Sequence, residues 1–183
     1  MFFRLSLTAI VVSLLGFAAP ALADPQDKAF FDSVTGAWSG PGEIVAGKYK
    51  GTKFVCKFSG KPSTEHAVGV AMDGRCRVGV FSQKMSAFIG QQGENYAGQF
   101  QNGADGDGLD VTSGRIDGNS IVVGINRKRL SGAMVAELKE PNVMNVTISV
   151  KVQEHLVPVI GMTLTRANQV GSARDNRQRE ISR

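Results

Sequence analysis

The sequence predicts an all-β protein, a single antiparallel up-and-down β-barrel of about 8–10 strands preceded by one short helix. From Ala37 to Arg166 the chain is a succession of short apolar or alternating segments, separated by glycine, asparagine and aspartate. The connections are too short for crossover helices, so neighbouring strands run antiparallel. Closure removes the unpaired edges of so long a meander, and a two-sheet sandwich is the alternative architecture.

Residues 1–23 have the pattern of a secretory signal peptide. Arg4 precedes an apolar segment, residues 5–19, and an Ala-Leu-Ala triplet ends at Ala23, where we expect cleavage. The apolar segment is shorter than the roughly 20 residues of a spanning helix and no second one follows, so we expect no transmembrane segment. The sequence therefore predicts an exported protein, periplasmic or secreted, of a Gram-negative bacterium.

Residues 24–36 are expected to form the short helix. Asp24 is a candidate N-cap, Pro25 suits the first turn, and Gly36 ends the helix. The apolar residues that give this helix a buried face are Phe30, Phe31 and Val34. Residues 37–166 follow as the barrel domain.

Residues 167–183 are expected to form a disordered basic tail, because their hydrophobicity is low. The arginines of this tail are Arg174, Arg177, Arg179 and Arg183. The chain has 21 basic and 16 acidic residues, so removal of Arg4 with the signal peptide leaves a net charge of +4. Because the basic residues are scattered singly without aromatic residues between them, we expect no nucleic-acid partner.

Two Asp-Gly pairs, Asp73-Gly74 and Asp117-Gly118, predict tight hairpin turns. The first turn would place Cys76 at the start of the returning strand. Cys56 and Cys76 are the only cysteines, and an exported chain meets an oxidising compartment. Their spacing resembles neither a CxxC pair nor a zinc site. We therefore predict a disulfide between Cys56 and Cys76 on neighbouring strands.

Alternation along the segments selects residues that face the interior and would line a ligand site. The candidate ligand-binding residues are Phe54, Phe58, Val70, Phe88, Val123, Met134, Val146 and Met162. Five methionines recur on alternating segments, and they either line an adaptable cavity or fill the core. They are Met72, Met85, Met134, Met144 and Met162.

The only tryptophan lies in "GAWSGPGEIV", at the head of the first expected strand. A helix, then Gly-x-Trp, then a meander whose last strand ends in a basic residue resembles the lipocalin-like (calycin) arrangement. This resemblance implies that Trp38 closes one end of the barrel and that Arg166, at the end of "GMTLTR", packs across the indole. A guanidinium over an indole face stabilises a fold by about 0.5–2 kcal/mol.

The longer pattern GxWxGxG, which ends at Gly42, is similar to the signature of nitrobindin-like haem barrels. That resemblance implies a histidine ligand late in the chain, and His155 in "KVQEHLVPVIG" is the candidate. His155 stands beside Glu154 at an expected turn, where an exposed histidine is the ordinary expectation. The predicted disulfide is also unlike a cytosolic haem protein, so we expect no cofactor.

No motif in the sequence predicts catalysis or a metal site. GxSxG, HExxH and a phosphate loop are absent, and Glu65 and His66 are adjacent, so a strand would direct them to opposite faces. The loop "QNGADGDGLD" offers Asp105, Asp107 and Asp110, but glycine would occupy both anchoring positions of a calcium loop. A hairpin loop is the preferred interpretation, and weak calcium binding is the alternative.

The sequence thus predicts an exported, non-enzymatic, lipocalin-like protein that binds a small apolar or amphipathic molecule inside the barrel. The alternative is a filled barrel that acts as a structural or interaction protein of the cell envelope, or as a secreted protease inhibitor. A haem-binding barrel is a further, minor alternative. Interior space separates the first two hypotheses, because ligand sites usually have at least roughly 300 Å³.

Overall fold

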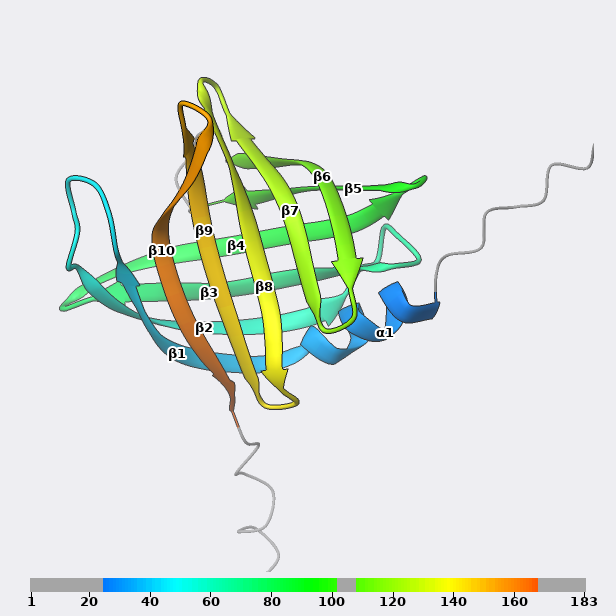
Figure 1. Ribbon diagram of the computed structural model, residues 1–183. Helices are drawn as coiled ribbons and strands as arrows, with labels where there is room; N and C mark the ends of the chain where they lie inside the picture. Colours follow the sequence, from blue (N-terminus) through cyan, green and yellow to red (C-terminus); the bar gives the residue numbers. More distant parts are fainter. Residues whose placement is uncertain (1–24, 102–107, 168–183) are drawn as a thin grey trace, which may run out of the picture.

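The structure is a computed structural model that describes residues 25–101 and 108–167. Ten antiparallel strands close into one barrel, and helix α1 precedes them (Figure 1). The predicted fold class is therefore confirmed. The expected signal peptide, residues 1–23, and all but the first residue of the expected tail lie outside the described residues.

The elements follow one another in the order α1 (Pro25–Val34), β1 (Gly36–Ile44), β2 (Lys53–Pro62), β3 (Gly69–Val78), β4 (Phe81–Gln92), β5 (Asn95–Gln101), β6 (Leu109–Asp117), β7 (Ser120–Arg127), β8 (Leu130–Glu140), β9 (Val143–Val152) and β10 (His155–Arg166). Each strand pairs with its neighbours in the chain, and β1 pairs with β10. Because the sheet closes on itself, the described strands form a barrel rather than the two-sheet sandwich that was the alternative.

Side-chain alternation determines which face of each strand is buried. In β7, Ile121, Val123 and Ile125 are buried whereas Val122 between them is exposed. The same two-residue period is clear in β1, β2 and β8, since successive side chains of a strand point to opposite faces. The interior is therefore apolar, and no polar or charged residue is buried within the described part of the chain.

The barrel has two different ends, because successive connections of a meander alternate between them. Helix α1 lies at one end, which we call the helix end (Figure 1). The turns after β1, β3, β7 and β9 lie on the opposite side, which we call the loop end. Phe30, Phe31 and Val34 of α1 are buried, so the helix covers the interior at its end of the barrel.

The predicted turn at Asp73-Gly74 is wrong, because β3 runs through both residues and the chain turns at Gly79 and Val80. Gly74 instead allows β3 to pass close to β2, where a Cβ at this position would lie 2.6 Å from the Phe58 ring. An Asp-Gly pair therefore marks close packing here and not a change of direction. The second predicted turn is confirmed, because the chain turns at Gly118 and Asn119, between Asp117 and Ser120.

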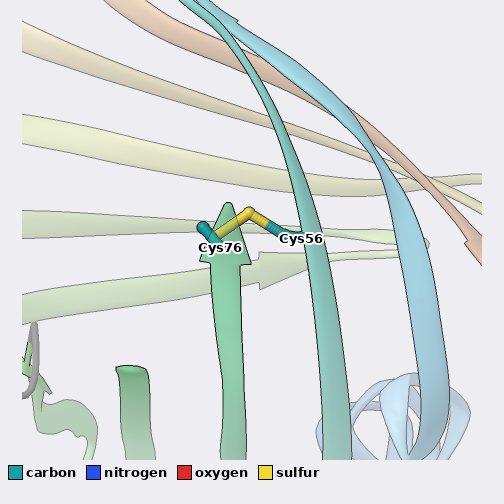
Figure 2. The surroundings of a disulfide bond; sticks show 2 residues. All are labelled: Cys56 and Cys76. Carbon is teal, nitrogen blue, oxygen red and sulfur yellow. A yellow bond between two sulfur atoms is a disulfide. The ribbon is translucent and has the colours of Figure 1, made fainter. Parts of the chain in front are cut away.

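The predicted disulfide is present in the structure. Cys56 of β2 and Cys76 of β3 lie directly opposite each other in the register of the two strands and are bonded (Figure 2). Cys56 is fully buried, so the bond lies against the interior of the barrel. It joins strands 20 residues apart in the sequence.

Candidate functional site

A cavity of about 140 Å³ lies inside the barrel, between α1 and the surrounding strands. The 19 described residues that line it come from α1 and from every strand except β1 and β6, and Ser86 is the only one of these with a polar side chain. A water molecule in a cavity needs two to four polar partners, and this lining offers almost none. The cavity is therefore suited to apolar groups.

Helix α1 forms the wall of the cavity at the helix end. Phe30, Phe31 and Val34 all line it. The Tyr96 hydroxyl of β5 donates a hydrogen bond to the Asp27 carboxylate, and the rings of Tyr96 and Phe31 lie 5.6 Å apart. These contacts hold the first turns of α1 against the barrel.

Trp38 and Arg166 close the same end of the barrel. The Arg166 guanidinium carbon lies 4.3 Å from the centroid of the Trp38 ring, and the indole is 1% exposed. The indole Nε1 donates to the Val34 carbonyl at 2.9 Å, and the guanidinium donates to the carbonyls of Ser33 and Thr35 at 2.7 and 2.6 Å. These carbonyls belong to the C-terminal end of α1, where the helix itself offers no partners and a positive charge is favoured.

The glycines of the GxWxGxG pattern have packing roles in this barrel. Gly36 has a φ of +99°, and a Cβ at this position would lie 2.8 Å from the Arg166 guanidinium. A Cβ at Gly42 would overlap the ring of Phe54 on the neighbouring strand. The pattern is thus accounted for by the closure at the helix end and by close strand packing, without reference to haem.

The cavity brings together most of the predicted ligand-binding residues. Those that line it are Phe58, Val70, Met134, Val146 and Met162. Val123 is fully buried in the core but lies outside the lining, and Phe54 packs partly buried against the core, also outside the lining.

The expectation that Phe88 faces the interior is wrong. Its neighbours Ala87 and Ile89 line the cavity, so Phe88 points to the outer face of β4. There its ring stacks on His66, with the ring centroids 5.3 Å apart. Alternation separates Phe88 from Met85, Ala87 and Ile89 but does not by itself say which of the two faces is buried, and Phe88 belongs to the outer one.

Fourteen of the 19 described lining residues were not among the predicted ligand-binding residues, and two groups of them had a signal in the sequence. The first is α1, whose apolar face was visible in the sequence, although nothing there indicated which end of the barrel it covers. The second is the remaining methionines, because all five methionines of the alternating segments line the cavity. These are Met72, Met85, Met134, Met144 and Met162.

His155 does not fit a haem site in this structure. It is the first residue of β10, at the loop end, where it is exposed and takes no part in the cavity lining. The cavity is also well below the roughly 300 Å³ of sites for larger ligands.

The calcium hypothesis gains no support from the described residues. Asp105 and Asp107 lie outside them, and the Asp110 carboxylate accepts a hydrogen bond from the Gln99 amide at 3.2 Å. Among the described residues, no group of three or more histidine, cysteine, aspartate or glutamate side chains is placed to hold a metal ion.

Comparison with protein-family models and with curated protein sequences finds no match for this chain. No helix within the described ranges is long and apolar enough to cross a membrane. The fold itself, a closed barrel of ten antiparallel strands with one short helix before the first, is consistent with a calycin-like barrel.

Proposed function

We propose that this protein is an exported, non-enzymatic barrel of lipocalin-like type that binds a small apolar or amphipathic molecule in its interior. The observation that carries the proposal is the apolar cavity of about 140 Å³ beneath α1. An apolar protein cavity of about 150 Å³ stays dry and accepts a molecule the size of benzene. The cavity has the volume and the chemistry for such a ligand.

The methionines of the lining would let the cavity accept a ligand larger than its present volume. Methionine is unbranched and has three rotatable side-chain bonds, so it repacks around differently shaped apolar groups. Met72 and Met85 lie on adjacent strands on one side of the cavity, and Met134, Met144 and Met162 come from β8–β10. Rotation of these side chains would enlarge the space without moving the strands.

The chemistry of the lining favours a carrier over an enzyme. Catalysis requires a base, acid or nucleophile held within reach of the bound molecule. Among the described residues that line the cavity, Ser86 is the only one with a hydroxyl, and none has an ionisable side chain. The ligand would be held by burial of apolar surface alone.

The alternative is a filled barrel that acts as a structural or interaction protein of the cell envelope. One observation favours it: the volume of about 140 Å³ is below the roughly 300 Å³ expected of an open ligand site. The two proposals therefore differ in whether apolar molecules occupy the cavity in the protein from its natural host.

Mass spectrometry of the protein purified gently from that host tests the proposal, first under native and then under denaturing conditions. We expect an excess mass that disappears on denaturation. A bare chain, together with no rise in melting temperature at saturating benzene, would contradict the binding proposal and support the filled barrel. A mature chain that begins at Asp24 would establish export.

A pair of substitutions on one strand locates the bound molecule. Ala136→Leu adds volume inside the cavity, whereas Ala133→Leu adds the same volume to the outer face of β8. We expect Ala136→Leu to remove the excess mass and the benzene stabilisation, and Ala133→Leu to retain both. If both variants retain the excess mass and the benzene stabilisation, the ligand binds outside this cavity.

A further inference from the structure

The two ends of the barrel carry very different charge. We define the loop-end rim as residues 43–57, 75–84, 108–110, 127–130 and 151–156, which contain 11 basic and three acidic residues. The corresponding part of the helix end contains five basic and seven acidic residues. It comprises residues 25–35, 61–68, 92–95, 115–120, 137–142 and 166. The described charges thus sum to +8 at the loop-end rim and −2 at the helix end.

Exposed apolar side chains gather on the same rim. Ten large apolar residues are exposed in the described part of the chain, and all except Val122 belong to the loop-end rim. Val80 and Phe81, at the turn between β3 and β4, are 91% and 78% exposed. Leu130 and Leu156 are exposed at two other turns of this end, more than half of each side chain being in contact with solvent. Single exposed apolar residues are ordinary, but such clustering marks an interaction surface.

Basic side chains of the rim also stand directly beside one another. Lys57 of β2 is opposite Arg75 of β3, and Arg75 is opposite Lys84 of β4. All three are exposed on the outer face of the barrel, and none makes an ion pair with another described residue. Like charges on directly opposed strand positions destabilise a sheet. An anionic partner would remove this repulsion.

We propose that the loop-end rim docks on an anionic lipid surface. Basic side chains near such a surface are attracted to the lipid headgroups, and apolar side chains gain by entering the boundary between headgroups and acyl chains. Val80, Phe81 and Leu130 lie at or beside turns, which are the parts of the rim that reach a flat surface first. A soluble polyanion would satisfy the charges but would leave these apolar tips in water, so the combination favours a membrane.

In this orientation the loop end of the barrel faces the lipid and α1 faces away from it (Figure 1). The docking surface and the cavity are separate features, because no residue named on the rim lines the cavity. The docking proposal can therefore be tested separately from ligand binding.

Vesicle flotation tests this proposal with protein purified from its natural host. We expect binding to equimolar phosphatidylglycerol and phosphatidylcholine vesicles, weak binding to phosphatidylcholine alone, and loss of binding at high salt. No binding to the anionic vesicles, or equal binding to both compositions, would overturn the proposal.

Two pairs of matched variants assign the binding to the rim. The charge variant Lys57→Gln, Arg75→Gln, Lys84→Gln is compared with Lys28→Gln, Lys61→Gln, Lys139→Gln, which removes three lysines from the helix end. The apolar variant Val80→Ser, Phe81→Ser is compared with Val122→Ser, which lies away from the rim. All variants retain the same chain ends, so any contribution of residues 1–24 or 168–183 is held constant.

We expect each rim variant to weaken vesicle binding by at least about tenfold and each control to leave it unchanged. All of the substituted side chains are exposed or project from turns, and an unchanged melting temperature verifies folding. Equal losses in rim and control variants would overturn the proposal. Loss with the charge variant alone, together with equally tight binding to a single-stranded oligonucleotide, would also overturn it and would identify a soluble polyanion as the partner.

Discussion

Arg166 lies over the indole of Trp38, with its guanidinium carbon 4.3 Å from the ring centroid, and so joins the two ends of the described chain. Trp38 is in the first strand and Arg166 ends the last one, where the two residues are also partners in the strand register. The same guanidinium donates to the Ser33 and Thr35 carbonyls at the end of α1. One side chain thus fixes the barrel closure and the position of the helix that covers the cavity.

Replacement of Trp38 by alanine is expected to lower the free energy of unfolding by about 3–5 kcal/mol. The indole is 1% exposed, and its loss leaves a void and an unpaired Val34 carbonyl. Urea titration followed by circular dichroism measures the change, with the exposed Val122→Ala as a control. An unchanged melting temperature of Trp38→Ala would show that the indole does not support this end of the barrel.

Arg166→Lys is expected to destabilise the protein by about 1–3 kcal/mol although it keeps the charge. An ammonium cannot reproduce the fork that contacts both Ser33 and Thr35 while stacking on an indole. A double-mutant cycle of Arg166→Gln with Trp38→Leu, which removes the cation and the ring, should give a coupling energy of about 0.5–2 kcal/mol. Strictly additive effects would mean that the stacked geometry contributes nothing to stability.

Gly36→Ala is expected to be more destabilising than Gly47→Ala. Both glycines have positive φ, +99° and +84°, so alanine is strained at either position. At Gly36 the new Cβ would also lie 2.8 Å from the Arg166 guanidinium, whereas at Gly47 nothing lies within 4 Å. The difference between the two melting temperatures isolates the contact with Arg166. If both variants lower the melting temperature equally, glycine is required at Gly36 only because of the positive φ, and not because of the contact with Arg166.

The fold was predictable because short apolar or alternating segments, separated by glycine, asparagine and aspartate, recur along the whole barrel, and this pattern depends on local sequence only. The wrong predictions concern positions where contacts between strands, rather than local sequence, determine the backbone path or the buried face. Asp73-Gly74 has the composition of a turn, but Gly74 is required for close approach to Phe58. Phe88 lies outside because alternation alone leaves open which face of a strand is buried, and the strand register decides it. The cavity volume is the small difference between the space that the barrel encloses and the summed volume of the side chains that fill it. It therefore cannot be read from any single segment of the sequence.

The disulfide is expected to stabilise the fold by about 3 kcal/mol, because it constrains a loop of 20 residues in the unfolded chain. We therefore expect the double variant Cys56→Ala, Cys76→Ala to unfold at a lower urea concentration than the oxidised protein. Addition of a reductant should lower the midpoint of the wild-type protein to a similar extent and leave that of the variant unchanged. A reductant effect on the variant would point to a cause other than this bond.

Two truncations separate the contribution of the last strand from that of the residues after it. The Ala167 amide donates to the Ala37 carbonyl at 2.8 Å, so a chain that ends at Asn168 retains this bond and Arg166. We expect it to melt at the same temperature as the full chain. A chain that ends at Thr165 lacks Arg166 and the hydrogen bond of Ala167. Its melting temperature should lie well below that of the full chain, because Trp38 loses the stacked guanidinium and the carbonyls at the end of α1 lose their donor. Aggregation or a lowered melting temperature of the longer truncation would show that residues 169–183 support the fold, contrary to the expectation of a basic tail separate from the barrel.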